Sequence, residues 1–118
     1  MANSIGDTIQ MYVAAWNEND DARRAELLAG CVAEAGVLTF PGNHVVGREQ
    51  LHALMAAFRR EHPHDKAALT QAVDQHHRCF RFTGTGIRPD GTTYGNTTEV
   101  GEVDADGLIV RVLSFADP

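Results

Sequence analysis

The stretch Thr39-Phe40-Pro41-Gly42, followed by Gly47-Arg48-Glu49-Gln50-Leu51, decides the fold. Residues 37–40 are apolar or β-branched, and the Pro-Gly pair after them is typical of a turn that closes a strand. We predict a helix from Gly47 to about Glu61, because the residue before Pro63 disfavours helical backbone. One face of this helix is apolar and carries Leu51, Leu54, Met55 and Phe58.

Two further helices are predicted before this stretch. The first is capped by Ser4 or Asp7 and places five apolar side chains on one face: Ile5, Ile9, Tyr12, Val13 and Trp16. A polar break follows at residues 17–21. The second helix is short, is capped by Asp20 or Asp21, and turns Ala25, Leu28 and Val32 inward. Gly36 ends this helical unit.

From Lys66 onward the pattern changes to strands, expected at residues 67–74, 79–85, 93–103 and 108–115 and separated by turns. The turn at residues 104–107 is a strong hairpin signal. This order predicts one α+β domain over residues 1–118. A cone-shaped, curved, mainly antiparallel sheet would wrap around three helices from the N-terminal half and enclose a hydrophobic pocket.

Composition and charge exclude several classes of function. The net charge of −6 over 118 residues argues against binding to nucleic acid or to an anionic membrane surface. No apolar run is long enough to span a bilayer, and the N-terminus lacks the pattern of a signal peptide, so we expect a cytoplasmic protein. Cys31 and Cys79 lack metal-site spacing, and there is no phosphate loop or nucleophile elbow. We therefore expect no metal and no organic cofactor.

The last strand is largely apolar on both faces. Val110, Val112 and Ser114 alternate with Ile109, Leu113 and Phe115, and Arg111 lies among them. A strand exposed to water on one face should alternate apolar and polar residues. We therefore predict that the first set lines the pocket and that Ile109, Leu113 and Phe115 meet a second subunit in a homodimer.

The strand–turn–helix stretch resembles the nuclear transport factor 2-like superfamily, which includes ketosteroid isomerases and SnoaL-like polyketide cyclases. The likeness covers nearly the whole chain and is strongest in residues 33–58 and 104–115. The family's Ala-Glu-Asp-Gly run appears here as Ala33-Glu34-Ala35-Gly36, and its Gly-Arg-Glu helix opening is intact at Gly47-Arg48-Glu49. The resemblance implies a pocket-bearing cone, but this fold serves many unrelated activities.

The resemblance also implies a polar centre made by Tyr12 and Glu99. In the isomerases, a tyrosine of the first helix and a protonated aspartate of a late strand bind the enolate oxygen. Tyr12 falls at the tyrosine position and Glu99 at or near the aspartate position. Glu99 shares a strand face with Val103, and a carboxyl group in an apolar cavity has a raised pKa. Two alternatives stay open: Tyr12 as a core aromatic, and Glu99 facing water or paired with Arg81.

Phe40 is the main departure from the isomerases. It stands where they carry the acid that removes the substrate proton, and a phenyl ring cannot accept a proton. Steroid isomerisation by the family mechanism is therefore not expected. His44, in the predicted mouth loop, is the histidine that could replace this base, unless it is simply a mobile loop residue. The expected pocket lining comprises Trp16, Phe40, Leu54, Met55, Phe58, Phe80, Phe82, Val112 and Ser114.

The resemblance implies a SnoaL-like enzyme that performs isomerase- or cyclase-type acid–base chemistry. Its ligand would be an apolar, carbonyl-bearing small molecule. The alternative is a noncatalytic module of the same fold, which holds a hydrophobic ligand in the cavity or recruits a partner through the sheet.

Overall fold

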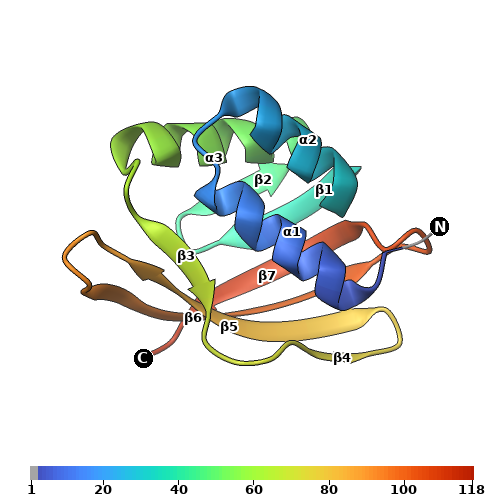
Figure 1. The fold of residues 1–118 in the computed structure, drawn as a ribbon. Helices are drawn as coiled ribbons and strands as arrows, with labels where there is room; N and C mark the ends of the chain where they lie inside the picture. Colours follow the sequence, from blue (N-terminus) through green and yellow to red (C-terminus); the bar gives the residue numbers. More distant parts are fainter. Residues whose placement is uncertain (1–2) are drawn as a thin grey trace.

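The structure is a computed structural model and describes residues 3–118. Three helices lie on one side of a strongly curved sheet (Figure 1). The helices are α1 (Ile5–Asn17), α2 (Asp21–Cys31) and α3 (Arg48–Glu61). The strands are β1 (Val32–Phe40), β2 (Asn43–Val46), β3 (Lys66–Leu69), β4 (Asp74–His76), β5 (Cys79–Ile87), β6 (Thr93–Val103) and β7 (Ile109–Ala116). The predicted α+β fold is confirmed.

The sheet is mixed and does not close into a barrel. Its seven strands follow the order β2-β1-β7-β6-β5-β3, and β4 pairs with β5 outside this path. β1 runs parallel to β7, and all other neighbours are antiparallel. β3 rises from the edge of the sheet toward the end of α3 (Figure 1). This rise leaves space between α1, β3 and the inner face of β5 and β6.

The helix starts follow the predicted caps. The Ser4 hydroxyl accepts a hydrogen bond from the Asp7 amide at 3.1 Å, and the Asp20 carboxylate accepts one from the Arg23 amide at 2.8 Å. α3 begins after Gly47, whose φ of 93° is disfavoured for any residue with a side chain. The Pro-Gly turn and the α3 start therefore lie where the sequence predicts them.

The inward face of α2 differs from the prediction. Ala25 is exposed, Val32 already belongs to β1, and Arg24 is fully buried beside Leu28. Burial of Arg24 is tolerated because its guanidinium donates to the Glu18 carbonyl and to the Asp21 carboxylate. An arginine whose guanidinium nitrogens are all hydrogen-bonded can replace the small apolar residue that periodicity alone favours.

Three strand boundaries were also wrong. β1 begins at Val32 rather than at residue 37, so Gly36 lies within β1 and does not end the helical unit. Residues 43–46 form β2, which pairs with the end of β1 across the Pro-Gly turn, rather than a mouth loop. The expected strand at 67–74 is split into β3 and β4, which pair with different parts of β5. β2, β3 and β4 have no apolar alternation of their own, because each lies at an edge of the sheet and is ordered by pairing with its neighbouring strand.

The last strand contains a β-bulge that corrects the predicted dimer face. Glu102 pairs with Arg111 but Val103 pairs with Ile109, so Val110 is an extra residue in β7. The bulge turns Ile109 to the same side as Val112, and both are fully buried in the core. Leu113 and Phe115 keep the outward orientation, so Ile109 does not belong to the outer face.

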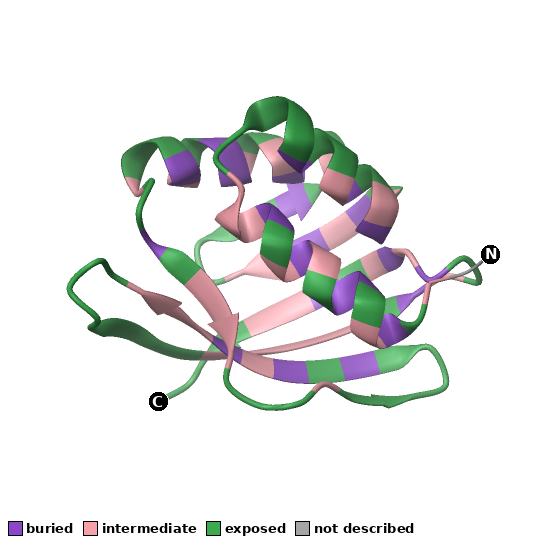
Figure 2. Cartoon of the chain, in the orientation of Figure 1, coloured by how far each residue is buried: buried purple, intermediate pink, exposed green. Residues whose placement is uncertain are grey.

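The closed core lies between the helices and the inner face of the sheet, where buried residues of both layers face each other (Figure 2). Its fully buried members come from every helix and from β1 and β7: Ile9, Leu28, Leu38, Leu51, Met55, Ile109 and Val112. None of the helices within residues 3–118 is long and apolar enough to cross a membrane.

Asn17, the last residue of α1, holds β3 in place. Its side-chain amide donates to the Ala67 carbonyl at 2.9 Å and its oxygen accepts from the Ala67 amide at 2.7 Å. The side chain thus satisfies the backbone of β3 as a neighbouring strand would. The rise of β3 depends on this contact.

We expect Asn17→Ala to destabilise the protein by about 2 kcal/mol, because two partly buried backbone groups of β3 lose their partners. Urea unfolding followed by far-UV circular dichroism measures the change. Asn43→Ala, at an exposed position of β2, is the matched control and should change stability by less than about 0.5 kcal/mol. Equal midpoints for the two variants would show that Asn17 does not anchor β3.

Candidate functional site

A cavity of about 170 Å³ lies under α1, between β3 and the inner face of β5 and β6. Its wall is mainly apolar, with a few polar groups among the lining residues. The apolar part includes Val13, Trp16, Phe58, Leu69 and Phe82, and the polar part includes Tyr12, Arg59, Asp65, Thr97 and Glu99. A largely apolar hollow with a few polar groups is typical of a small-molecule site.

Three of the nine predicted pocket residues line this cavity: Trp16, Phe58 and Phe82. Met55, Phe80 and Val112 lie in the closed core, and Leu54 packs against that core. The difference arises because the cavity opens between β3 and β5–β6. The predicted lining also includes residues of α3, β5 and β7 that fill or cover the closed core.

Phe40 and Ser114 lie outside the cavity lining. The Phe40 ring packs edge-on against Trp16, with ring centroids 6.0 Å apart, and so supports the wall from behind. Ser114 lies beside Phe40 in a separate surface groove at the end of β7. Phe40 is therefore a packing residue behind the cavity wall.

Tyr12 and Glu99 meet inside the cavity. Tyr12, on α1, is 1% exposed, and its hydroxyl donates a hydrogen bond to Glu99 Oε1 at 3.3 Å. Glu99, on β6, lies opposite Phe82 of β5 and is partly buried. The alternative partner, Arg81, is exposed and forms an ion pair with Asp74 at 2.6 Å. Glu99 therefore points inward, as its strand face predicts.

Burial controls the charge of this pair. Removal from water raises the pKa of Glu99 to about 7, although the hydrogen bond from Tyr12 acts in the opposite direction. Burial, together with the nearby negative charge of Glu99, raises the pKa of Tyr12 well above its ordinary value. Near neutral pH, Tyr12 is thus a hydroxyl donor, and Glu99 is present both as the protonated acid and as the carboxylate. Such a carboxyl group can both give and take a proton.

His44 lies away from this centre. It is exposed on β2, where its Nδ1 is 3.0 Å from the Thr39 hydroxyl, and it does not line the cavity. The Pro-Gly turn sends the chain back along the edge of the sheet, where β2 pairs only with β1. The hypothesis that His44 replaces the missing base has no support in this geometry.

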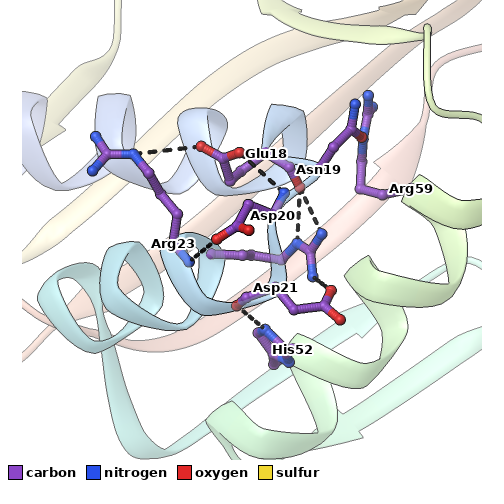
Figure 3. A network of polar contacts seen from close by, with 8 residues as sticks. Glu18, Asn19, Asp20, Asp21, Arg23, His52 and Arg59 are labelled. Atoms are coloured by element: carbon purple, nitrogen blue, oxygen red, sulfur yellow. Dashed lines mark hydrogen bonds and ion pairs between the residues drawn. The ribbon is translucent and has the colours of Figure 1, made fainter.

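Arg59 is a cavity residue that the sequence analysis missed. It is 3% exposed and donates to Asn19 Oδ1 at 2.8 Å, to the Pro63 carbonyl at 2.7 Å and to the Asp65 carbonyl at 2.7 Å. Burial lowers the pKa of its guanidinium. Figure 3 shows Arg59 of α3 beside Asn19 of the break between α1 and α2. Through these hydrogen bonds, Arg59 connects the segment between α1 and α2 to the loop leading into β3.

A signal for Arg59 was present in the sequence. It lies four residues after Met55, on the helix face that carries the apolar residues. Asp65 and Tyr94, which also line the cavity, had no such signal. Tyr94 is 42% exposed at the cavity wall, and the Arg88 guanidinium lies 4.2 Å from its ring centroid.

Within residues 3–118, no group of three or more His, Cys, Asp or Glu side chains is arranged to hold a metal ion. Cys31 is buried and Cys79 is exposed, and they form no disulfide with each other. Burial raises the pKa of the Cys31 thiol to about 12.

The SnoaL-like domain family matches residues 9–112 of this chain. The chain therefore belongs to the SnoaL-like family, as the resemblance implied. A comparison with curated proteins returned no match.

Solved structures support the same assignment. A SnoaL-like protein from Agrobacterium tumefaciens strain C58, whose name proposes an isomerase, is 31% identical, with 95% of this chain and 96% of that chain covered and a TM-score of 0.88. A Sinorhizobium meliloti protein whose name proposes a polyketide cyclase is 18% identical over 92% and 94% of the two chains, with a TM-score of 0.72. A nuclear transport factor 2-like protein of unknown function from Cytophaga hutchinsonii is 14% identical over 100% and 94%, with a TM-score of 0.74. At these identities, the last two show the fold alone.

Proposed function

We propose that this protein is a small-molecule enzyme of isomerase or cyclase type, acting by acid–base chemistry on an apolar, carbonyl-bearing compound. The observation that carries the proposal is the hydrogen bond between Tyr12 and Glu99 inside an apolar cavity, with the pKa of Glu99 raised to about 7. A catalytic group with a pKa near the working pH transfers protons most effectively. The name of the Agrobacterium protein agrees with this class of chemistry.

In the proposed mechanism, the Tyr12 hydroxyl, which donates its one proton to Glu99 in the free protein, turns to donate it to the carbonyl oxygen of the ligand. The ionised form of Glu99 takes a proton from the adjacent carbon, and negative charge develops on the oxygen that Tyr12 stabilises. Protonated Glu99 then returns the proton, to the same carbon or to another carbon of the ligand. Glu99 thereby takes over the proton transfer that Phe40 cannot perform.

The cavity volume limits the size of the ligand. A cavity of about 150 Å³ lined by apolar side chains holds a single benzene ring, and drug-sized pockets begin near 300 Å³. At about 170 Å³, the cavity suits a molecule of roughly one ring rather than a steroid. Cyclohexanone is therefore a suitable probe.

Exchange of the α-hydrogens of cyclohexanone in D₂O, followed by proton NMR, tests the proposal. We expect the protein to accelerate exchange, and Glu99→Gln to reduce the acceleration by roughly 10²-fold or more. Glu102→Gln, on the exposed face of the same strand, is the control and should leave the rate unchanged. Exchange at the buffer rate would reject the enzyme proposal.

The second candidate function is a noncatalytic binding module. It is favoured by the packing of Phe40 against Trp16, which leaves the cavity without the base of the isomerases. The same NMR samples separate the two candidates. Shifts of the Trp16 indole signals on adding cyclohexanone, without accelerated exchange, would support binding alone.

The homodimer stays a proposal and is supported by the outer face of the sheet. Phe115 is 59% exposed and Leu113 is partly buried, and both project from the face opposite the helices. Sedimentation at micromolar concentration should show a dimer that Phe115→Asp disrupts.

The cytoplasmic location also stays a prediction; the unpaired Cys31 and Cys79 suit a reducing compartment.

A further inference from the structure

Asp65 also lines the cavity, and it carries a carboxyl group that the Tyr12–Glu99 pair does not use. Asp65 lies in the segment between α3 and β3 and is 5% exposed. Its Oδ2 atom is buried and has no hydrogen-bond partner within residues 3–118. Buried polar groups are almost always paired, and leaving one unpaired costs on the order of 1–3 kcal/mol. The unpaired state of Asp65 therefore needs an explanation.

The neighbouring basic side chains donate no hydrogen bond to the Asp65 carboxyl group. The Arg59 guanidinium donates to the backbone carbonyls of Asp65 and Pro63 and to Asn19, and none of these bonds goes to the Asp65 carboxyl group. His62 Nδ1 lies 3.7 Å from Asp65 Oδ2, which is longer than a hydrogen bond. The carboxyl group is thus buried beside two basic residues without accepting a hydrogen bond from either.

The backbone of Asp65 is fixed on both sides. Its amide donates to the His62 carbonyl at 3.3 Å, and its carbonyl accepts from Arg59. The side chain therefore starts from a rigid position, and rotation about its Cβ–Cγ bond exchanges the two oxygens. A fixed acceptor at the wall of an apolar cavity is suited to bind a donor group of a ligand, because little order is lost on binding.

We propose that Asp65 is a second polar anchor of the cavity and that the natural ligand carries a hydroxyl or amine donor, which Asp65 accepts. The proposal rests on the proposed function only in placing the ligand in this cavity, where Tyr12 binds its carbonyl oxygen and Glu99 faces the adjacent carbon. The ligand class is then a ring-sized apolar compound with a carbonyl group and at least one O–H or N–H donor, such as a hydroxyketone or a phenolic ketone. A site that hydrogen-bonds a ligand donor discriminates strongly against analogues that lack it.

Phenol and toluene test this anchor without a carbonyl group. They have nearly the same shape and differ in one hydroxyl, so the ratio of their dissociation constants reports the donor contact. NMR titration of the Trp16 indole signals measures both constants in wild-type protein and in Asp65→Leu, Asp65→Asn and Glu99→Gln. A hydrogen bond to a charged acceptor changes affinity by roughly tenfold or more.

We expect wild-type protein to prefer phenol, and Asp65→Leu to reduce that preference by about tenfold. If Asp65→Leu does not fold, the Asp65→Asn variant provides the test. Its preference for phenol should be about threefold smaller than that of wild type, since a neutral acceptor binds a donor more weakly. Glu99→Gln should leave most of the preference in place. A preference that survives in both Asp65 variants, or that is lost only in Glu99→Gln, overturns the proposal.

The outcome is independent of the exchange assay with cyclohexanone. Failure of that assay would reject acid–base chemistry at Glu99 and leave the anchor standing. Failure of the phenol preference would reject the anchor and leave the chemistry standing.

Discussion

The free energy of unfolding of the wild-type protein is expected to fall as the pH rises from about 4.5 to about 7, and Glu99→Gln is expected to abolish most of this fall. The pKa of Glu99 is raised in the folded state, so the folded protein retains a proton that the unfolded chain releases. The resulting stabilisation is fully present below the unfolded pKa of about 4.5 and is lost as the pH rises through the folded pKa of about 7. It amounts to roughly 3 kcal/mol.

Urea unfolding at a series of pH values between 4 and 8 measures this effect. The free energy of unfolding of wild-type protein should fall across the range relative to that of Glu99→Gln. Glu102→Gln, whose side chain is exposed on the same strand, should follow wild type. Parallel curves for wild type and Glu99→Gln would mean that the Glu99 carboxyl group is not in an apolar environment.

Replacing Arg59 with Met is expected to destabilise the protein by about 3 kcal/mol or more. The variant keeps the apolar part of the side chain but leaves Asn19 and the carbonyls of Pro63 and Asp65 without their donor. Because these contacts join the α1–α2 break to the segment before β3, the cavity wall should loosen as well. Thermal unfolding measures the stability, and Trp16 fluorescence reports the wall.

Arg60→Met is the matched control for Arg59. Arg60 is the next residue of α3 and is exposed, so its replacement should change stability by less than about 0.5 kcal/mol. Similar unfolding temperatures for the two variants would contradict the role given to Arg59.

The sequence predicts the fold well where local chemistry determines the structure. The caps Ser4 and Asp20, the Pro-Gly turn and the helix starting after Gly47 all follow from side-chain and backbone preferences of a few residues. The inward orientation of Tyr12 and Glu99 follows in the same way from helical and strand periodicity, together with the family resemblance.

The sequence fails where the structure depends on contacts between distant segments. The bulge at Val110 reverses the orientation of Ile109, and no local pattern reveals an extra residue in a strand. β2 exists only because β1 pairs with it. The position of the cavity depends on how β3 rises from the sheet, and that rise depends on Asn17 contacting Ala67 across 50 residues. Asp65 reaches the cavity for the same reason.

The central claim is that Glu99 is a carboxyl group in an apolar cavity, hydrogen-bonded by Tyr12 and titrating near neutral pH. Carbon NMR of protein labelled at the glutamate carboxyl carbons measures this directly, with Glu99→Gln assigning the signal. Tyr12→Phe should move the midpoint higher still, because the hydrogen bond from Tyr12 lowers the pKa of Glu99. Our account predicts a wild-type midpoint at about pH 7. A midpoint at the ordinary value of 4.5, unchanged in Tyr12→Phe, would contradict it.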